Sequence, residues 1–142
     1  MKNLKYLLIS LIAFLSILNV NQITNAQEKI IIKELIKGTK GVEGKKFSYP
    51  RWKQAELRFL KVIIPAGKKT PIHKHPAPMI VHVFKGRLKH KRGDVINYFR
   101  AGETFIESNY GKKHFVENVG NVEAVLFVSV SSVVGMPTTI NE

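Results

Sequence analysis

The sequence predicts an all-β protein, built as a sandwich or barrel of short strands. After residue 26, no apolar pattern with helical spacing runs for the length of an ordinary helix. Short runs rich in β-branched and aromatic residues recur instead, and glycine, proline or asparagine separates them at regular intervals. Regular alternation of short strands and turns is typical of sandwiches and barrels. The chain has 142 residues, which is room for one domain.

The expected strands follow one another with a turn signal after each. In chain order they are residues 28–37, 55–64, 79–84, 87–91, 95–99, 104–106, 113–117 and 122–134. The first is rich in isoleucine, and the last is the longest. Arg92, Gly93 and Asp94 are expected to form the hairpin turn between two of the strands, because Gly and Asp favour turns.

The first 26 residues have the pattern of a secretory signal peptide. Lys2 and Lys5 precede an apolar run at residues 6–18, and a short polar stretch with small residues ends at Ala26. An uncleaved membrane anchor is the alternative, but the apolar run is shorter than the about 20 residues that a membrane span needs. We therefore expect cleavage after Ala26, a mature domain at residues 27–142, and a periplasmic or secreted location.

The chain is strongly basic and contains no cysteine, with a formal net charge of +13. Without disulfides, an exported domain of this size depends on core packing, helped by a metal or a partner subunit. The charge favours acidic partners. An exported protein rarely meets nucleic acid, however, and many lysines alternate with apolar residues as on a solvated strand face. We expect no nucleic-acid binding and only weak contact with anionic envelope material.

Two histidines separated by one residue are the most informative feature of the chain. His73 and His75 lie in an extended segment that Pro71 and Pro76 restrict on either side. Side chains at positions i and i+2 of an extended backbone point to the same face. Neutral imidazole is the commonest metal ligand in proteins. With His114 from a later strand, the pair can form a three-histidine site for Fe, Mn, Zn, Ni or Cu inside a barrel.

The two remaining histidines are expected to lie outside this site. His82 follows Val81 on a strand and faces the opposite side, so we expect it to point outward or toward another subunit. His90 lies between Lys89 and Lys91, and we expect it to be solvated.

The glycines around the histidine pair resemble the first motif of the cupin family. That motif is a glycine, five residues, His-x-His, three or four residues, a glutamate, six residues and a closing glycine. Gly67 lies at the right distance before His73 and His75, and Gly86 stands where the closing glycine belongs. Met79 occupies the position of the glutamate.

A later segment resembles the second cupin motif. Gly102 opens it, and His114 and Asn118 match its histidine and asparagine. Ser108 replaces the proline of the motif, and Gly111 comes one residue late. The resemblance covers residues 57–134. A narrower resemblance is to the small exported single-domain cupins. It implies a double-stranded β-helix, the jelly-roll barrel of cupins, with a divalent metal in its mouth.

The departures from the motifs decide which side chains are candidates for the site. Met79 cannot accept a proton, and we expect it to fill the barrel interior as an apolar side chain. Glu107 is the nearest carboxylate worth testing as a replacement, although a glutamate is ordinarily a surface residue. Tyr110 is expected at the mouth, and Asn118 is expected to brace the turn rather than bind metal.

Three functions stay open at this point. The first is an exported cupin that binds a divalent metal through three histidines, with a small-molecule ligand in the barrel mouth. The second is a metal-dependent dioxygenase or isomerase. The third is a metal-free basic barrel that binds anionic envelope material. The fold alone does not choose a reaction. A homodimer is also expected, through the isoleucine-rich edge at residues 29–36.

Overall fold

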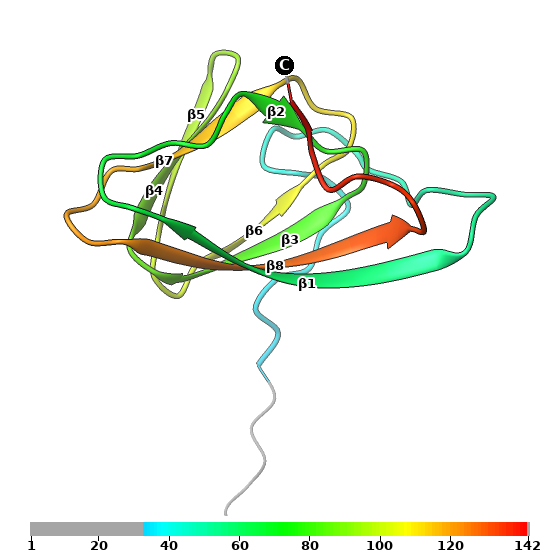
Figure 1. Ribbon diagram of the computed structural model, residues 1–142, viewed down its shortest axis with the longest axis horizontal. Helices are drawn as coiled ribbons and strands as arrows, with labels where there is room; N and C mark the ends of the chain where they lie inside the picture. Colours follow the sequence, from blue (N-terminus) through cyan, green and yellow to red (C-terminus); the bar gives the residue numbers. More distant parts are fainter. Residues whose placement is uncertain (1–32, 142) are drawn as a thin grey trace, which may run out of the picture. The chain divides into compact units, whose positions relative to one another are not determined.

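Two antiparallel β-sheets face each other and enclose a barrel interior (Figure 1). The computed structural model describes residues 33–141, and every strand below lies in the compact unit Glu34–Glu142. One sheet has the strand order β1-β8-β3-β6, and the other has the order β5-β4-β7-β2-β9. The strands are β1 (Ala55–Ile64), β2 (His73–Lys74), β3 (Met79–Lys85), β4 (Arg87–Arg92), β5 (Val95–Arg100), β6 (Thr104–Glu107), β7 (His114–Asn118), β8 (Ala124–Val133) and β9 (Ile140–Asn141). Within the described residues, no helix is long and apolar enough to cross a membrane.

The chain passes back and forth between the two sheets. The strands β1, β3, β6 and β8 belong to the first sheet, and β2, β4, β5, β7 and β9 belong to the second. Only β4 and β5 follow each other within one sheet, as a hairpin whose turn contains Gly93. This winding brings β2 and β7 side by side, although about 40 residues separate them in the sequence.

The core lies between the sheets because the strands alternate apolar side chains inward and outward. In β3, Met79, Val81 and Val83 point inward and are at most 5% exposed, whereas Ile80 and Phe84 face outward. The buried apolar cluster consists of Ile64, Ala77, Met79, Val81, Val83, Leu88, Phe105, Val116, Ala124, Leu126, Val128 and Val130. These residues come mainly from β1, β3, β4, β6, β7 and β8 and form one continuous core.

Most of the predicted strands are confirmed. The first one is wrong over residues 33–37, the part of it that the structure describes. The strand at residues 55–64 has the bounds of β1, and the later ones correspond to β3 through β8 within two residues at each end. The expected first strand, residues 28–37, is absent over residues 33–37. Residues 33–37 pair with no strand in the structure, and β-propensity alone does not make a strand. The two-residue strands β2 and β9 had no signal of their own in the sequence.

Several predictions for the N-terminus fall on residues that the structure does not describe. The signal peptide at residues 1–26 and the first part of the expected dimer edge at residues 29–36 lie outside the described residues. Cleavage after Ala26, export and dimerisation remain predictions from the sequence.

Gly86→Ala is expected to destabilise the fold more than Gly102→Ala. Both glycines have a positive φ, 92° and 89°, which strains an L-residue by about 1–2 kcal/mol. At Gly86, an added Cβ would also lie 2.7 Å from the Cα of Ala124, whereas at Gly102 it would meet nothing within 4 Å. We expect the free energy of unfolding of Gly86→Ala to fall by about 1–3 kcal/mol more, as measured in urea. Equal losses in the two variants would show that the contact with Ala124 has no energetic weight.

Candidate metal centre

A row of three polar side chains crosses the second sheet on its inner face. Arg92 on β4 lies opposite His114 on β7, and His114 lies opposite His73 on β2. Directly opposed residues of antiparallel strands point to the same face. All three are therefore buried, with 3%, 1% and 7% of their surface exposed.

The three histidines predicted from the sequence lie close together in the interior. His75 follows His73 by two residues and shares its face. The ring centroids are 4.8 Å apart for His73 and His75, 4.4 Å for His73 and His114, and 5.0 Å for His75 and His114. Their potential ligand atoms all lie within 4.8 Å of one another. The spacing of the sequence therefore predicted a real spatial cluster.

His90 joins this cluster, and the prediction that it is solvated is wrong. It is fully buried on β4, and its ring stacks on that of His114 at a centroid distance of 4.8 Å. Leu88, His90 and Arg92 alternate with Lys89 and Lys91 along β4, so the lysines occupy the outer face and the histidine the inner one. The alternation of side chains along the strand predicts the burial of His90 correctly, whereas the charge of its neighbours does not.

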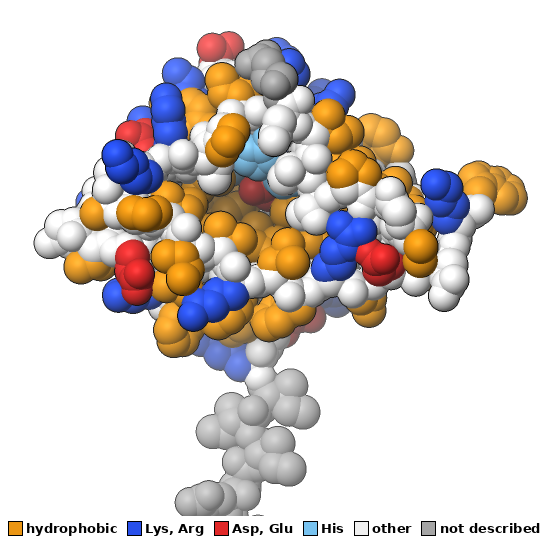
Figure 2. All heavy atoms as spheres, viewed as in Figure 1, with side chains coloured by type: hydrophobic (Ala, Val, Ile, Leu, Met, Phe, Trp, Pro, Cys, Tyr) orange, Lys and Arg blue, Asp and Glu red, His pale blue; other side chains and the backbone are white. Residues whose placement is uncertain are grey.

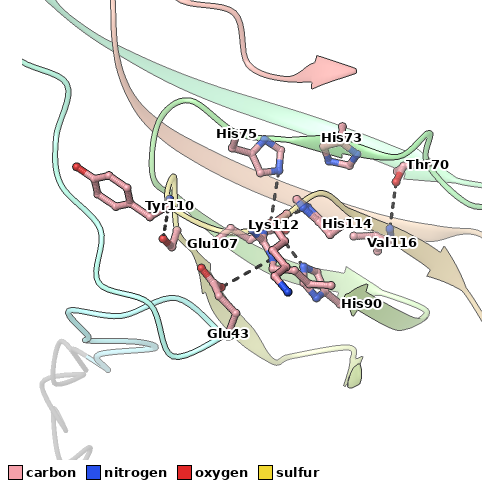
Figure 3. A network of polar contacts seen from close by, with 12 residues as sticks. Glu43, Thr70, His73, His75, His90, Glu107, Tyr110, Lys112, His114 and Val116 are labelled. Atoms are coloured by element: carbon pink, nitrogen blue, oxygen red, sulfur yellow. Dashed lines mark hydrogen bonds and ion pairs between the residues drawn. The ribbon is translucent and has the colours of Figure 1, made fainter. Parts of the chain in front are cut away.

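Glu107 reaches the same point from the opposite sheet (Figure 3). Its Oε2 atom lies 2.8 Å from Nη2 of Arg92 and 2.8 Å from Nε2 of His114. The Nε2 atoms of His75 and His90 lie 3.5 Å and 3.6 Å from the same oxygen. Glu107 is only 2% exposed, so it is not the surface residue that its type suggested. One carboxylate oxygen is thus surrounded by a guanidinium and three imidazoles.

The carboxylate enters the interior beside the position where the first cupin motif has its glutamate. Glu107 on β6 is the direct antiparallel partner of Met79 on β3. Both side chains therefore point inward at the same level of the barrel. Met79 is 5% exposed and belongs to the apolar core, as expected from the sequence. The position of Glu107 could have been found from the sequence only by also predicting which residue of β6 pairs with Met79.

The protonation states of the cluster suit metal binding. Burial would raise the pKa of the Glu107 carboxyl, but contacts with His114 and two further imidazoles outweigh burial and hold that pKa well below its usual range. Burial lowers the pKa of His114 to about 4, against the opposing effect of Glu107, and burial also lowers the pKa of His73. At neutral pH, Glu107 is therefore ionised and these two imidazoles are neutral. Metals bind these forms of the side chains.

Backbone carbonyls orient two of the rings. Nδ1 of His73 donates to the carbonyl of Pro71 at 2.8 Å, and Nδ1 of His75 donates to the carbonyl of Thr138 at 3.0 Å. A carbonyl oxygen only accepts, so the proton of each ring sits on Nδ1. The Nε2 lone pairs of His73 and His75 are therefore available to a ligand. Such hydrogen bonds on the outer nitrogen are typical of metal-binding histidines.

The other two histidines have no such partner. Both ring nitrogens of His114 and both of His90 are buried without a hydrogen bond to any described residue. His114 Nε2 lies close to Glu107, but the contact is out of line for a hydrogen bond. A buried polar atom without a partner costs about 1–3 kcal/mol, so these four ring nitrogens favour a further interaction such as a bound cation. Two overlapping groups fit a metal ion, His73 with His75 and His114, and His90 with Glu107 and His114.

A cavity of about 310 Å³ leads to the cluster. His73, His75 and Glu107 line part of it, and aliphatic or aromatic side chains such as Val81, Phe105 and Leu126 form most of its wall. Figure 2 shows histidine and acidic atoms at the bottom of a hollow with hydrophobic side chains around it. Pockets with apolar walls and a few polar groups are the usual sites for small molecules.

The C-terminal segment forms one side of this cavity. Thr138, Thr139 and Asn141 line it. Arg58 on β1 donates to the hydroxyl of Thr138 at 2.9 Å and to the carbonyl of Met136 at 2.6 Å. In β9, Asn141 lies opposite His73. The segment is therefore attached to both sheets and holds His75 through the Thr138 carbonyl.

The remaining candidates lie away from the histidines. Tyr110 is exposed, its hydroxyl lies 2.7 Å from that of Ser48, and Figure 3 shows its ring pointing away from the cluster. It does not line the cavity that His73 and Glu107 line.

Asn118 is buried and braces the turn that follows β7. Its amide donates to the carbonyls of Ile64 and Val122, at 2.9 Å and 2.7 Å, and its Oδ1 accepts from the amide of Gly120 at 2.9 Å. His82 is half-buried and lies 2.9 Å from the Thr104 hydroxyl through Nδ1, outside the cluster.

The fold is the double-stranded β-helix of cupins, as the sequence motifs implied. The chain is similar to the cupin domain of Cnp3 from Schizosaccharomyces pombe, with 17% identity and a TM-score of 0.50 over 61% of this chain and 64% of that one. An uncharacterized conserved protein with a double-stranded β-helix domain from Klebsiella pneumoniae matches 87% of this chain and 97% of its own, with 16% identity and a TM-score of 0.51. The DMSP lyase DddQ from Ruegeria pomeroyi has 20% identity and a TM-score of 0.52 over 60% of this chain and 42% of that one.

The likeness to these structures concerns the fold. The chain spans less than two thirds of the length of the Cnp3 domain and of DddQ. No family model and no curated protein sequence matches the chain. The function must therefore be argued from the side chains of the site itself.

Proposed function

We propose that this protein binds one divalent transition metal ion through His73, His75 and His114, with Glu107 as a fourth donor. The observation behind the proposal is the convergence of buried imidazoles and an ionised carboxylate at a place where the ring nitrogens of His114 have no hydrogen bond to a described residue. Imidazole and carboxylate donors suit Fe, Mn, Zn, Ni and Cu alike, so the donor set does not select one of them. When bound, such an ion supplies Lewis-acid or redox chemistry beside the cavity.

One ion fits this cluster better than two. The Arg92 guanidinium lies 2.8 Å from Glu107 and already places a positive charge beside the donors. Two dications next to it would repel each other and the guanidinium in a buried environment. Of the two overlapping groups, we favour the one with His73 and His75 because both line the cavity, whereas His90 does not.

The properties of Glu107 favour binding over proton-transfer chemistry. A carboxylate whose pKa lies well below its usual range is a weak proton acceptor, and an efficient general base has a pKa near the working pH. Glu107 therefore suits the role of ligand better than that of the base of an isomerase. Oxidative turnover, as in a dioxygenase, is the second candidate because the cavity meets the same donors. A metal-free barrel for anionic envelope material has only the net charge in its favour.

The cavity favours a small, neutral and largely apolar ligand. Histidines aside, Glu107 is the only charged side chain among the described residues that line it. A dicarboxylate would find no lysine or arginine in the wall, and Glu107 would repel it. A volume of about 310 Å³ is at the lower end for small-molecule pockets, and threonine and asparagine from the C-terminal segment add a few polar contacts.

His114→Ala is expected to abolish tight metal binding. The wild-type protein, treated with a chelator and titrated with Co²⁺ or Zn²⁺ in a calorimeter, should bind one ion per chain. The variant should bind roughly 100-fold more weakly or worse, because even supporting residues of metal sites change affinity by about 10–100-fold. His82→Ala is the matched control, since His82 contacts Thr104 outside the cluster. Absence of metal binding in the wild type, or an unchanged affinity in His114→Ala, would refute the proposal.

Moving the carboxylate from β6 to β3 is expected to restore binding. Glu107→Gln keeps an oxygen for Arg92 but removes the charge, and we expect roughly 10- to 100-fold weaker Zn²⁺ binding. Met79→Glu in that background should recover at least about tenfold, because position 79 is the antiparallel partner of position 107. Thermal melts should show that both variants remain folded. A double variant that binds no better than Glu107→Gln would mean that the register does not make the two positions equivalent.

The metal-free protein is expected to bind 4-methylphenol and not oxalate. Binding can be followed through the NMR shifts of the methyl groups of Val81, Leu126 and Val128. Val62→Phe should weaken the binding of 4-methylphenol by filling the cavity and should leave the Zn²⁺ affinity unchanged, because Val62 lines the cavity as an apolar residue. Oxalate binding to the metal-free protein at the same strength as 4-methylphenol would contradict the proposed ligand class.

A further inference from the structure

Glu43 has a buried carboxylate with no hydrogen-bond partner among the described residues. Its side chain is 6% exposed, and both of its oxygens lack a hydrogen bond. A neighbouring cation is Arg92, whose Nε lies 4.0 Å from Oε2 of Glu43 and has no hydrogen bond to a described residue. A buried carboxylate is expensive unless it is paired and hydrogen-bonded. The gap between these two groups therefore needs an explanation.

Arg92 lies beside both Glu43 and Glu107. Its Nη2 donates to Glu107 at 2.8 Å, its Nη1 donates to the carbonyl of Lys112 at 3.0 Å, and its Nε faces Glu43. The guanidinium thus has one carboxylate in hydrogen-bond contact and a second one about 1 Å beyond that contact.

Two glycines make room for this arrangement. A Cβ at position 41 would lie 2.6 Å from Oε2 of Glu43, and a Cβ at position 111 would collide with the guanidinium of Arg92. Neither Gly41 nor Gly111 has a positive φ. The structure therefore favours glycine at these positions because it is small, and not because of its backbone conformation. Because neither glycine has a side chain, the Glu43 carboxylate and the Arg92 guanidinium can lie next to each other.

The proposed metal would compete with Arg92 for Glu107. The Oε2 atom that faces His75, His90 and His114 is the same atom that accepts from Arg92. A cation that takes this oxygen would face a guanidinium at short range, and like charges at short range repel strongly in a buried site. If Arg92 loses its ion pair with Glu107, it becomes a buried cation without a carboxylate in contact.

We propose that Glu43 becomes the ion-pair partner of Arg92 when Glu107 binds the metal. This inference rests on the proposed metal site. It assigns Glu43 as a positioning residue that acts through Arg92 and raises metal affinity without touching the ion. In the structure, Arg92 pairs with Glu107, and its Nε lies 4.0 Å from Glu43. In the loaded protein, Arg92 closes the gap to Glu43.

Glu43→Gln tests this role by two readouts. The Zn²⁺ affinity of the variant, measured by calorimetry on the chelator-treated protein, should fall about tenfold, as expected when a buried charge loses its partner. The melting temperature of the metal-free variant should stay the same or rise, because the substitution removes a buried carboxylate that has no hydrogen bond to a described residue. Glu123→Gln is the matched control, since it changes the charge equally at an exposed pair with Lys85.

The outcomes separate this inference from the metal proposal. Absence of Zn²⁺ binding in the wild type would remove the metal site and this inference together. Wild-type binding with an equal affinity in Glu43→Gln would overturn the role of Glu43 and leave the metal site standing. A lower affinity together with a lower melting temperature of the metal-free variant would make Glu43 a general structural brace, which also overturns the inference.

Discussion

The contact between the buried Glu107 carboxylate and Arg92 is the interaction on which the site depends. Burying a carboxylate without a cation costs several kcal/mol, and at 2% exposure Glu107 is almost free of water. Arg92 and the surrounding imidazoles offset that cost and keep the carboxylate ionised. Glu107 belongs to one sheet, whereas Arg92, His90 and His114 belong to the other. The same contact therefore joins the two sheets and creates an electrostatic centre in the interior.

The winding of the chain explains why these groups meet. Because the chain crosses between the sheets after almost every strand, β2, β4 and β7 become neighbours in one sheet while β3 and β6 pair in the other. Antiparallel register then sets the level of each side chain. Arg92, His114 and His73 occupy one row across their sheet, and Glu107 and Met79 occupy one row across theirs. Residues that are distant in sequence thus reach one place without any long loop to bring them there.

The sequence predicted the part of the site that depends on local spacing. His73 and His75 share a face because they are two residues apart, and the glycine spacing of the cupin motifs pointed to His114. The sandwich-or-barrel fold and most strand bounds also followed from alternating apolar residues. These signals are local, or they repeat a known pattern, so one sequence is enough to find them.

The missed features depend on partners that are distant in the sequence. The basic neighbours of His90 predict that it is solvated, although the alternation along β4 places it inside. The position of Glu107 follows from its pairing with Met79, and β9 exists because the C-terminal segment pairs with β2. Neither strand pairing can be predicted from the residues of the paired segments alone. A register between distant strands is set by the packing of the whole barrel, so it cannot be derived from local propensity.

The position of Glu107 changes what a missing motif residue means in this fold. A motif describes positions along one strand, but the barrel interior is a surface on which neighbouring strands contribute equivalent positions. Met79 and Glu107 face the same interior at the same level, so a carboxylate lost from one strand can be supplied by the next. The two positions differ electrostatically, because on β6 the carboxylate also contacts Arg92, with which the proposed metal would have to compete. With Glu107 bound to a metal, as we propose, Arg92 would need a second carboxylate, and Glu43 lies 4.0 Å from its Nε.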